Sequence, residues 1–394
     1  MSKNNTVEFV RAFSAFYVML LHVMIWCISW TDFKSLPNPK LAVDFFIVIS
    51  GYLMMQVFYR NQEFGIDKRR IASFYVGRFF RIAPMYYVTL LLAVAISQYF
   101  IAGYTLIQEA DGQMWPVNSI YIASKVDYSW TNIFLHLTFL FGFLPKASLS
   151  TLLPDWSIGL EMQFYLLLPA IFLLFRSVHA ASNALILMII ASWLNTILIT
   201  GMGFYEPSFL TLKLHCFILG MLLFLAIVPT ARKAERYRYL LIGIGIALYQ
   251  SHLYNFEGKD WRFWILPVFV LMFYFFANKD DLLAKLPSTV KRIISFMSDM
   301  SYSVYLLHGF FISACGLLFF KNPDFMQLGR LAKLAITLPF VCFFSYVFGY
   351  FCQRFIELPG IALGRKLSQR ISLQLYASQH SSITGKGTVS SHLV

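Results

Sequence analysis

The feature that most constrains this chain is a succession of apolar segments, each long enough to cross a lipid bilayer. A transmembrane helix needs about 20 mostly apolar residues to span roughly 30 Å of hydrocarbon. A shorter apolar stretch near 132–144 is better suited to a re-entrant or interfacial segment. The sequence therefore predicts an all-α fold, a polytopic helical membrane bundle of about ten spans: Phe9–Ser29, Leu41–Tyr59, Met85–Ala102, Ile158–Phe175, Asn183–Gly201, Phe209–Val228, Tyr239–Tyr254, Arg262–Ala277, Tyr302–Phe320 and Leu331–Cys352.

Lysine and arginine residues between these segments predict the orientation of the chain. They gather in the loops after the second, sixth and eighth spans and after the last one, which places every cluster on one side of such a bundle. Cytoplasmic loops of membrane proteins carry this excess of positive charge. We therefore expect an integral membrane protein with both termini cytoplasmic.

Composition supports this class and excludes others. Hydrophobic residues make up 58% of the chain and charged residues 13%, whereas soluble domains carry about 25% charged residues. The net charge of +13 is explained by loops facing anionic lipid, so membrane lipids are expected partners and nucleic acid is not. The five cysteines lack metal-binding spacing, so no metal site is expected. Residues 1–360 are expected to form one membrane domain, and the polar residues 361–394 a disordered cytoplasmic tail.

Arg11 and His22 are ionisable residues within the first predicted span, where such residues are functional candidates by default. Their spacing of eleven residues amounts on a helix to about three turns plus 20°, so they share a face roughly 16 Å apart. This predicts a track through the membrane with a cation at its cytoplasmic end and a base in the outer half. The alternative is that Arg11 reaches lipid headgroups or pairs with Glu8, while His22 hydrogen-bonds a neighbouring helix.

Two carboxylates are expected at a depth similar to that of His22. Asp44 lies near the outer end of the second span, and Glu161 lies about one turn inside the fourth, with Tyr165 one turn further along the same face. Either carboxylate could hold the imidazole in one tautomer and steady the charge that it acquires. The alternatives are an interfacial Asp44 facing water and a Glu161 favoured by the helix dipole. Ser50 follows Asp44 on the second span, where it could equally serve helix packing.

Basic residues before the third span are candidates for binding phosphate. Arg78 and Arg81 are three residues apart, so on a helix they would point the same way, and Arg70 lies upstream with Lys68 and Arg69. The guanidinium group is planar and permanently charged and can bind phosphate in a fork. Coenzyme A offers a diphosphate and a ribose phosphate to such a site. The alternative is that these residues only contact lipid.

The stretch from Ser301 to His308 begins the ninth predicted span from the cytoplasmic side. On that boundary, His308 lies too far from the outer half of the bilayer to contact His22 directly. We expect His308 to have a structural role or to contact the phosphate-bearing donor that the arginines would bind.

Together these motifs resemble the membrane acyltransferase-3 family. The carriers of the resemblance, in order, are Arg11 with His22, Asp44-Phe45-Phe46 with Ser50-Gly51-Tyr52-Leu53, Arg78-Phe79-Phe80-Arg81, Trp156-Ser157-Ile158 with Glu161 and Tyr165, Ser301-Tyr302 with Tyr305 and His308, and Glu357-Leu358-Pro359. The resemblance implies about ten membrane helices over a membrane acyltransferase domain in the bacterial cytoplasmic (inner) membrane. It also implies O-acylation of sugars of lipopolysaccharide, exopolysaccharide or related glycans, a catalytic first-helix histidine and an acetyl-CoA donor. Glu8 and Ala12 depart from the Asp and Gly that many members carry beside the arginine, and the C-terminal hydrolase-like domain of many members is not found here.

The sequence thus predicts an acyl-CoA-dependent O-acyltransferase that acts on a cell-surface or lipid-linked glycan. Catalytic roles are assigned to His22, Glu161 and Asp44, acyl-CoA binding to Arg11, Arg78, Arg81 and Arg70, and supporting roles to Ser50, Trp156, Tyr165, Tyr302 and His308. His22 would act as a general base or become acylated itself, and these routes stay open. Acetyl-CoA or another acyl-CoA is a substrate rather than a bound cofactor, and the glycan is the second partner. A homo-oligomer stays an option, and a transporter or flippase for a glycan or small molecule is the alternative function.

Overall fold

The computed structural model describes residues 4–28, 39–59, 67–110, 126–177, 179–204, 207–228, 231–253, 260–278 and 281–384. Within these residues the fold is helical and has no strand, which confirms the predicted class. The longer helices are α1 (Asn5–Ile28), α2 (Pro39–Tyr59), α3 (Lys68–Ala95), α4 (Ser97–Ala110), α7 (Trp156–Phe175), α8 (Ala180–Met202), α9 (Leu210–Ile227), α10 (Lys233–Leu253), α11 (Ile265–Asn278), α13 (Ser288–Leu318), α15 (Arg330–Cys352) and α16 (Leu358–Thr384). The shorter ones are α6 (Trp130–Leu137), α12 (Asp281–Ala284) and α14 (Pro323–Gln327), with 3-10 turns η2 (Leu140–Phe143), η3 (Ala147–Leu149) and η4 (Trp261–Trp264) and the π-helical η5 (Gln353–Glu357).

Nine helical segments of the described chain are long and apolar enough to cross a membrane, in agreement with a polytopic bundle. The predicted span 239–254 falls on α10, which is not one of the nine and which begins with charged residues at Lys233, Glu235, Arg236 and Arg238. The apolar stretch near 132–144 forms the eight-residue α6 and the turn η2. These pieces are too short to span, as expected of a re-entrant or interfacial segment.

Two helices begin well before their predicted spans, which corrects the expected surroundings of several site residues. The expected basic loop before the third span is part of α3, which starts at Lys68 and contains Pro84 in its interior. Asp67 caps this helix by accepting a hydrogen bond from the backbone N–H of Arg70 at 2.8 Å, and this bond lowers the pKa of its carboxyl. Likewise, α13 starts at Ser288 rather than at Tyr302.

The segment predicted as a tail from residue 361 begins within a helix in the structure. Residues 358–384 form α16, which packs along α3. Ser368 Oγ on α16 donates a hydrogen bond of 3.1 Å to the carbonyl oxygen of Ser73 on α3. Residues 385–394 of the predicted tail lie outside the described residues.

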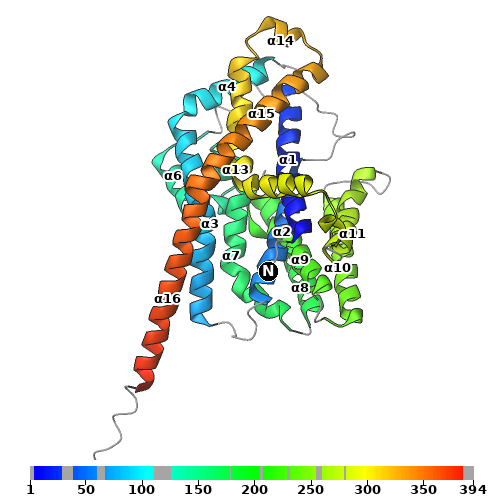
Figure 1. Ribbon diagram of the computed structural model, residues 1–394, viewed down its shortest axis with the longest axis vertical. Helices are drawn as coiled ribbons and strands as arrows, with labels where there is room; N and C mark the ends of the chain where they lie inside the picture. The colour runs from blue at the N-terminus through cyan, green and yellow to red at the C-terminus, as the bar shows by residue number, and fades with distance from the viewer. Residues whose placement is uncertain are drawn as a thin grey trace, which may run out of the picture.

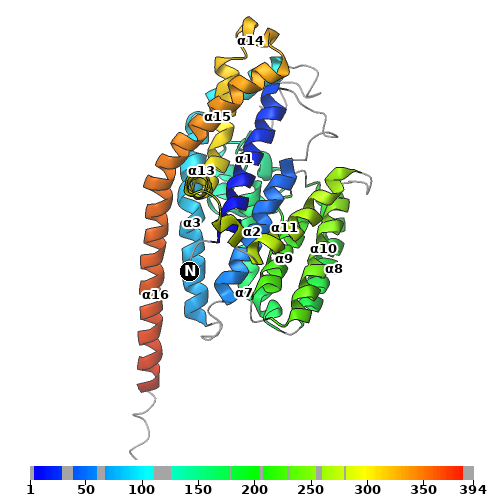
Figure 2. The same cartoon turned by 45° about the vertical axis from the view of Figure 1, so that its right-hand side comes forward.

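Figures 1 and 2 show how the helices are arranged around the centre of the bundle. Helices α8 to α11 gather on one side, and α3 lies with α16 on the other. Between them, α1 packs against α2, α13 and α15, and α2 packs against α9. The helix α16 runs alongside α3 and extends past its end (Figure 2).

The contact between α2 and α9 depends on glycine at two positions. A Cβ atom at Gly220 would collide with the backbone of Val48, and one at Gly51 would collide with the backbone of Phe217. Small residues allow membrane helices to approach this closely. The tight contact holds α2, which carries several of the residues described below, against the deeply buried α9.

We expect Gly220→Ala to lower the stability of the folded protein by about 1–3 kcal/mol, because the added methyl group would force α2 and α9 apart. Thermal unfolding in detergent measures this loss. Gly245→Ala on α10 is the matched control, because a Cβ there has open space around it and should leave the unfolding temperature close to that of the wild type. Equal unfolding temperatures for the two variants would contradict the expectation.

Candidate functional site

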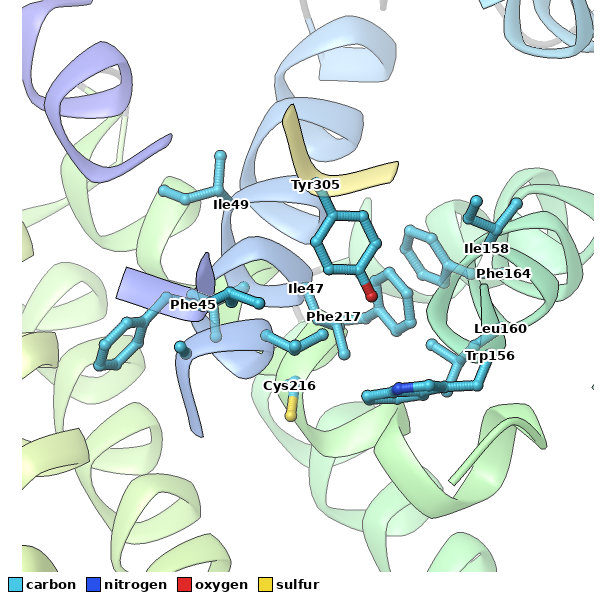
Figure 3. Close-up of a cluster of buried hydrophobic side chains, with 14 of the residues drawn as sticks. Phe45, Ile47, Ile49, Trp156, Ile158, Leu160, Phe164, Cys216, Phe217 and Tyr305 are labelled. Carbon is cyan, nitrogen blue, oxygen red and sulfur yellow. The ribbon is translucent and has the colours of Figure 1, made fainter. Parts of the chain in front are cut away.

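A cavity of about 640 Å³ lies where helices from both halves of the chain converge. Its walls come from α1, α2, α3, α7, α9, α13 and α16. Figure 3 shows the apolar part of this region, where side chains of α2, α7, α9 and α13 meet. Its charged and polar lining residues are Arg11, Ser50, Arg78, Arg81, Ser157, Glu161, Tyr165, Ser301, Tyr302, Tyr305 and Arg365.

The charged lining is mostly positive, with four arginines and one glutamate. Arg11 donates a hydrogen bond of 3.0 Å to Ser301 Oγ, which joins α1 to α13. The guanidinium carbon of Arg78 lies 5.9 Å from the centroids of the Phe74 and Tyr165 rings, so an aromatic face supports it. The lining therefore favours an anionic ligand.

Glu161, the acidic residue of the lining, is held by two hydroxyl groups. Ser50 Oγ on α2 donates a hydrogen bond of 2.7 Å to Glu161 Oε1, and Tyr165 OH donates to the same oxygen. The three predicted site residues Ser50, Glu161 and Tyr165 thus come together at the cavity wall. Glu161 was expected to contact His22. Its hydrogen bonds go instead to Ser50 on α2 and to Tyr165 on its own helix.

A buried carboxyl group that was not a predicted site residue lies within electrostatic range of two of the arginines. Glu357 ends the π-helical turn η5 and accepts a hydrogen bond from Ser303 Oγ on α13. Its charge interacts with those of Arg11 and Arg81. A π-helical turn often marks a functional site, and here it brings a counter-charge from the end of α15 to the arginines of α1 and α3.

His22 and His308 form a hydrogen-bonded pair, which corrects the expectation that His308 is too distant. His22 Nδ1 lies 2.8 Å from His308 Nε2, and the two rings are nearly parallel with centroids 5.1 Å apart. The reason is the length of α13. His308 lies twenty residues into this helix, or about 30 Å from its start, rather than close to one end.

The hydrogen bonds of this pair select one tautomer for each ring. His308 Nδ1 lies 3.2 Å from the carbonyl oxygen of Val304, which can only accept, so Nδ1 carries the proton. In a neutral ring, Nε2 of His308 must then accept, and His22 Nδ1 must donate to it. The proton of a neutral His22 therefore sits on Nδ1, which leaves the lone pair on Nε2 to act as a base.

Tyr305 connects this histidine pair with the cavity. Its ring centroid lies 6.1 Å from that of His308, which follows Tyr305 by one helical turn on α13. Tyr305 itself lines the cavity. Its hydroxyl donates to the carbonyl oxygen of Pro154 at 2.6 Å and lies 2.9 Å from Ser157 Oγ. Figure 3 shows the ring reaching from α13 toward side chains of α2 and α7.

The turn that receives Tyr305 is fixed by a buried polar network that sequence reasoning missed. Asp155 precedes α7 and accepts hydrogen bonds from Tyr86 OH at 3.1 Å and Thr151 Oγ1 at 2.9 Å. His136 Nδ1 lies 3.2 Å from the same carboxylate, and its Nε2 lies 3.1 Å from Ser150 Oγ. The network ties α3, α6 and the start of α7 together, so the turn has little freedom to move.

Asp44 was expected near His22 on α1, but it contacts α9 and α10. Its carboxylate lies 2.7 Å from Lys213 Nζ on α9 and accepts a hydrogen bond of 2.5 Å from Gln250 Nε2 on α10. The structure thus brings Asp44 together with a buried lysine rather than with His22. Lys213 is a charged residue within the apolar span 209–228, so the rule that flagged Arg11 and His22 applies to it equally.

Of three further predicted site residues, one lines the cavity and two do not. Tyr302 lines the cavity and donates a hydrogen bond of 2.9 Å to the carbonyl oxygen of Ile82 on α3. Trp156 is buried at the start of α7, beside the lining residue Ser157. Arg70 is not part of the cavity lining; it donates a hydrogen bond of 2.5 Å to the carbonyl oxygen of Phe58, near the end of α2.

Comparison with known proteins places the chain in a family. Residues 4–354 match the model of the acyltransferase-3 family, which is described as an acyltransferase domain. A similar protein is the peptidoglycan O-acetyltransferase OatA of Listeria monocytogenes serovar 1/2a (strain ATCC BAA-679 / EGD-e), which is 26% identical over 170 residues. That alignment covers 43% of this chain and 24% of the relative, so the chain matches about a quarter of the relative's length. No solved structure matches the chain. Because the family model covers most of the chain, the chain belongs to the acyltransferase-3 family.

Proposed function

We propose that this member of the acyltransferase-3 family transfers an acyl group, most simply acetyl, from acyl-CoA to a hydroxyl group of a cell-surface or lipid-linked glycan. The single observation that carries the proposal is a positively charged cavity lined by Tyr305, whose ring neighbours that of His308 in a histidine pair with a defined tautomer. The acceptor class is supported by the similar peptidoglycan O-acetyltransferase.

The charge of the cavity supports a phosphate-bearing acyl donor. The lining contains four guanidinium groups and one carboxylate, and that carboxylate accepts hydrogen bonds from Ser50 and Tyr165. Arginine forks match phosphate oxygens, and coenzyme A carries a diphosphate and a ribose phosphate. We propose that Arg78 and Arg81 bind these phosphates and that the pantetheine arm lies along the apolar lining toward Tyr305.

The proposed reaction uses the free lone pair of His22. His22 Nε2 takes the proton of the acceptor hydroxyl while the hydroxyl oxygen forms a bond to the thioester carbonyl carbon. The carbon–sulfur bond then breaks, and the departing thiolate takes the proton from the imidazolium, so coenzyme A leaves as a thiol. His308 accepts the hydrogen bond from His22 Nδ1 throughout, which steadies the positive charge that forms on the imidazole.

A direct test supplies membranes containing the protein with acetyl-CoA labelled on its acyl carbon. Label passing to a glycan fraction supports the proposal. Folded protein that neither binds coenzyme A nor transfers the label overturns it. The family match favours this enzymatic proposal over the transporter alternative, which would be indifferent to coenzyme A.

We expect Arg81→Ala to raise the KM for acyl-CoA about 10- to 100-fold. This factor corresponds to the free energy that one hydrogen bond to a charged group contributes to binding. The turnover number should change less, because Arg81 binds the phosphates rather than the reacting atoms. Initial rates of label transfer at varied acyl-CoA separate the two constants. Arg176→Ala, an exposed arginine after α7 that does not line the cavity, should keep the wild-type KM. A KM for Arg81→Ala equal to that of this control would contradict the assignment.

A further inference from the structure

We propose that α16 forms one wall of the donor pocket and that Arg365 binds a phosphate group of the acyl donor. This inference rests on the proposed function and extends it. Ile361 and Arg365 of α16 line the cavity, although the matched family region ends at residue 354. The pocket therefore draws part of its lining from a helix outside the family region.

The face that α16 turns toward α3 is built for close packing. A Cβ at Gly364 would lie 2.6 Å from Phe80 Cβ, and one at Gly360 would lie 2.9 Å from Pro84 Cγ. Ser368 completes this face through its hydrogen bond to Ser73. Residues four apart on a helix share a face, so 360, 364 and 368 form one stripe. This stripe fixes both the distance and the rotation of α16 relative to α3.

The rotation that the glycine stripe imposes brings the next stripe to the cavity. Ile361 and Arg365 each follow one of these glycines and are themselves four residues apart, so they lie together on an adjacent face. That face borders the cavity beside Arg78 and Arg81 of α3. Two packed helices thus bring three guanidinium groups to one pocket.

Arg365 is suited to a phosphate at the pocket entrance. Its side chain is exposed as well as part of the lining, which is expected of a residue at the opening. A guanidinium keeps its charge in water and binds phosphate in a fork. Phosphate could come from the donor or from a lipid headgroup. The donor is the occupant proposed here, because Arg365 shares its cavity with Arg78 and Arg81 rather than pointing to the surface alone.

The first test compares Arg365→Ala with the matched control Arg370→Ala, an exposed arginine of α16 that does not line the cavity. Direct binding of coenzyme A to purified protein is measured first, without any transfer step. We expect the Kd of Arg365→Ala to rise about 10-fold, because an exposed hydrogen bond to phosphate lies at the low end of its range. Arg370→Ala should bind like the wild type. If the wild type does not bind coenzyme A, the proposed function fails; if it binds and both variants match it, only the role of Arg365 fails.

S-acetyl pantetheine, which lacks the nucleotide and its phosphates, distinguishes phosphate binding from a general defect. Transfer from this truncated donor should be equal in wild type and Arg365→Ala. A parallel decrease with both donors would overturn the phosphate assignment. If Arg365 serves a lipid headgroup instead, coenzyme A affinity will be unchanged while added anionic lipid alters wild type and variant differently.

Gly364→Val tests the wall itself. The larger side chain should push α16 away from Phe80 and raise the KM for acyl-CoA while sparing S-acetyl pantetheine. Gly245→Val is the control, because a Cβ at that position of α10 meets nothing within 4 Å. An unchanged acyl-CoA KM in Gly364→Val would overturn the role of α16 as a pocket wall.

Discussion

His22→Ala is expected to lower the turnover number for acyl transfer about 10²- to 10⁴-fold, the contribution usual for a general base. The cavity and its arginines remain in this variant, since His22 is not part of the cavity lining. Coenzyme A should therefore bind with its wild-type Kd. Label transfer measured at saturating acyl-CoA, together with direct binding, isolates the chemical step.

His252→Ala is the matched control, because His252 is exposed in the last turn of α10, a helix that packs against α9 and α11. It should transfer acyl groups at the wild-type rate. Retained activity in folded His22→Ala would exclude His22 from the chemistry under either route, base or acyl carrier.

Variants of His308 test whether the hydrogen bond between the histidines selects the reactive tautomer. His308→Ala removes the acceptor and should lower the turnover number about 10- to 100-fold, since the bond acquires charge when His22 is protonated. His308→Gln can present an amide oxygen near the former Nε2 and should recover part of this loss. A purely structural role would predict no rescue and would change donor affinity as well, so separate measurement of the turnover number and of the KM decides between them.

Lys213→Met is expected to destabilise the fold by about 3–5 kcal/mol, because it removes the ammonium group that lies 2.7 Å from the buried carboxylate of Asp44. Asp44→Asn should have a similar effect by leaving the lysine charge buried. In the double variant Asp44→Asn/Lys213→Met neither charge is left, and the amide of Gln250 can still hydrogen-bond to the new asparagine. The double variant should therefore regain most of the stability, as measured by thermal unfolding in detergent.

The same double variant decides whether Asp44 also has the catalytic role that the sequence suggested. If Asp44 only fixes α2 against α9 and α10, folded double variant will transfer acyl groups at close to the wild-type rate. If Asp44 takes part in the reaction, the double variant will fold and remain inactive. Failure of the double variant to regain stability would contradict the ion-pair interpretation itself.

The sequence predicted the fold class better than it predicted the contacts between the candidate site residues. Periodicity and apolar length are properties of one helix at a time, so the helical bundle and the shared face of Arg11 and His22 could be read directly from it. The partner of each residue depends on how far a helix is rotated about its axis. Asp44 was expected near His22 because both lie at similar depth, yet α2 turns it toward Lys213.

Helix boundaries account for the other misplacements. Hydropathy ends a span where charges begin, but α13 continues as a helix through the polar residues from Ser288 to Ser301, and α3 does so from Lys68 to Arg81. The pairing of His308 with His22 was hidden by the first of these extensions. The contribution of α16 was hidden because its face carries glycine and serine, whose packing value appears only when the partner helix is present.

The size of the cavity creates a problem of chemical selectivity. A cavity of about 640 Å³ has room for many water molecules when no substrate fills it. A base that activates a sugar hydroxyl can also activate water, and water would hydrolyse the acyl donor. Under the proposed function, the yield of transferred acyl groups is then set less by the basicity of His22 than by how completely donor and acceptor displace the solvent from the space beside Tyr305.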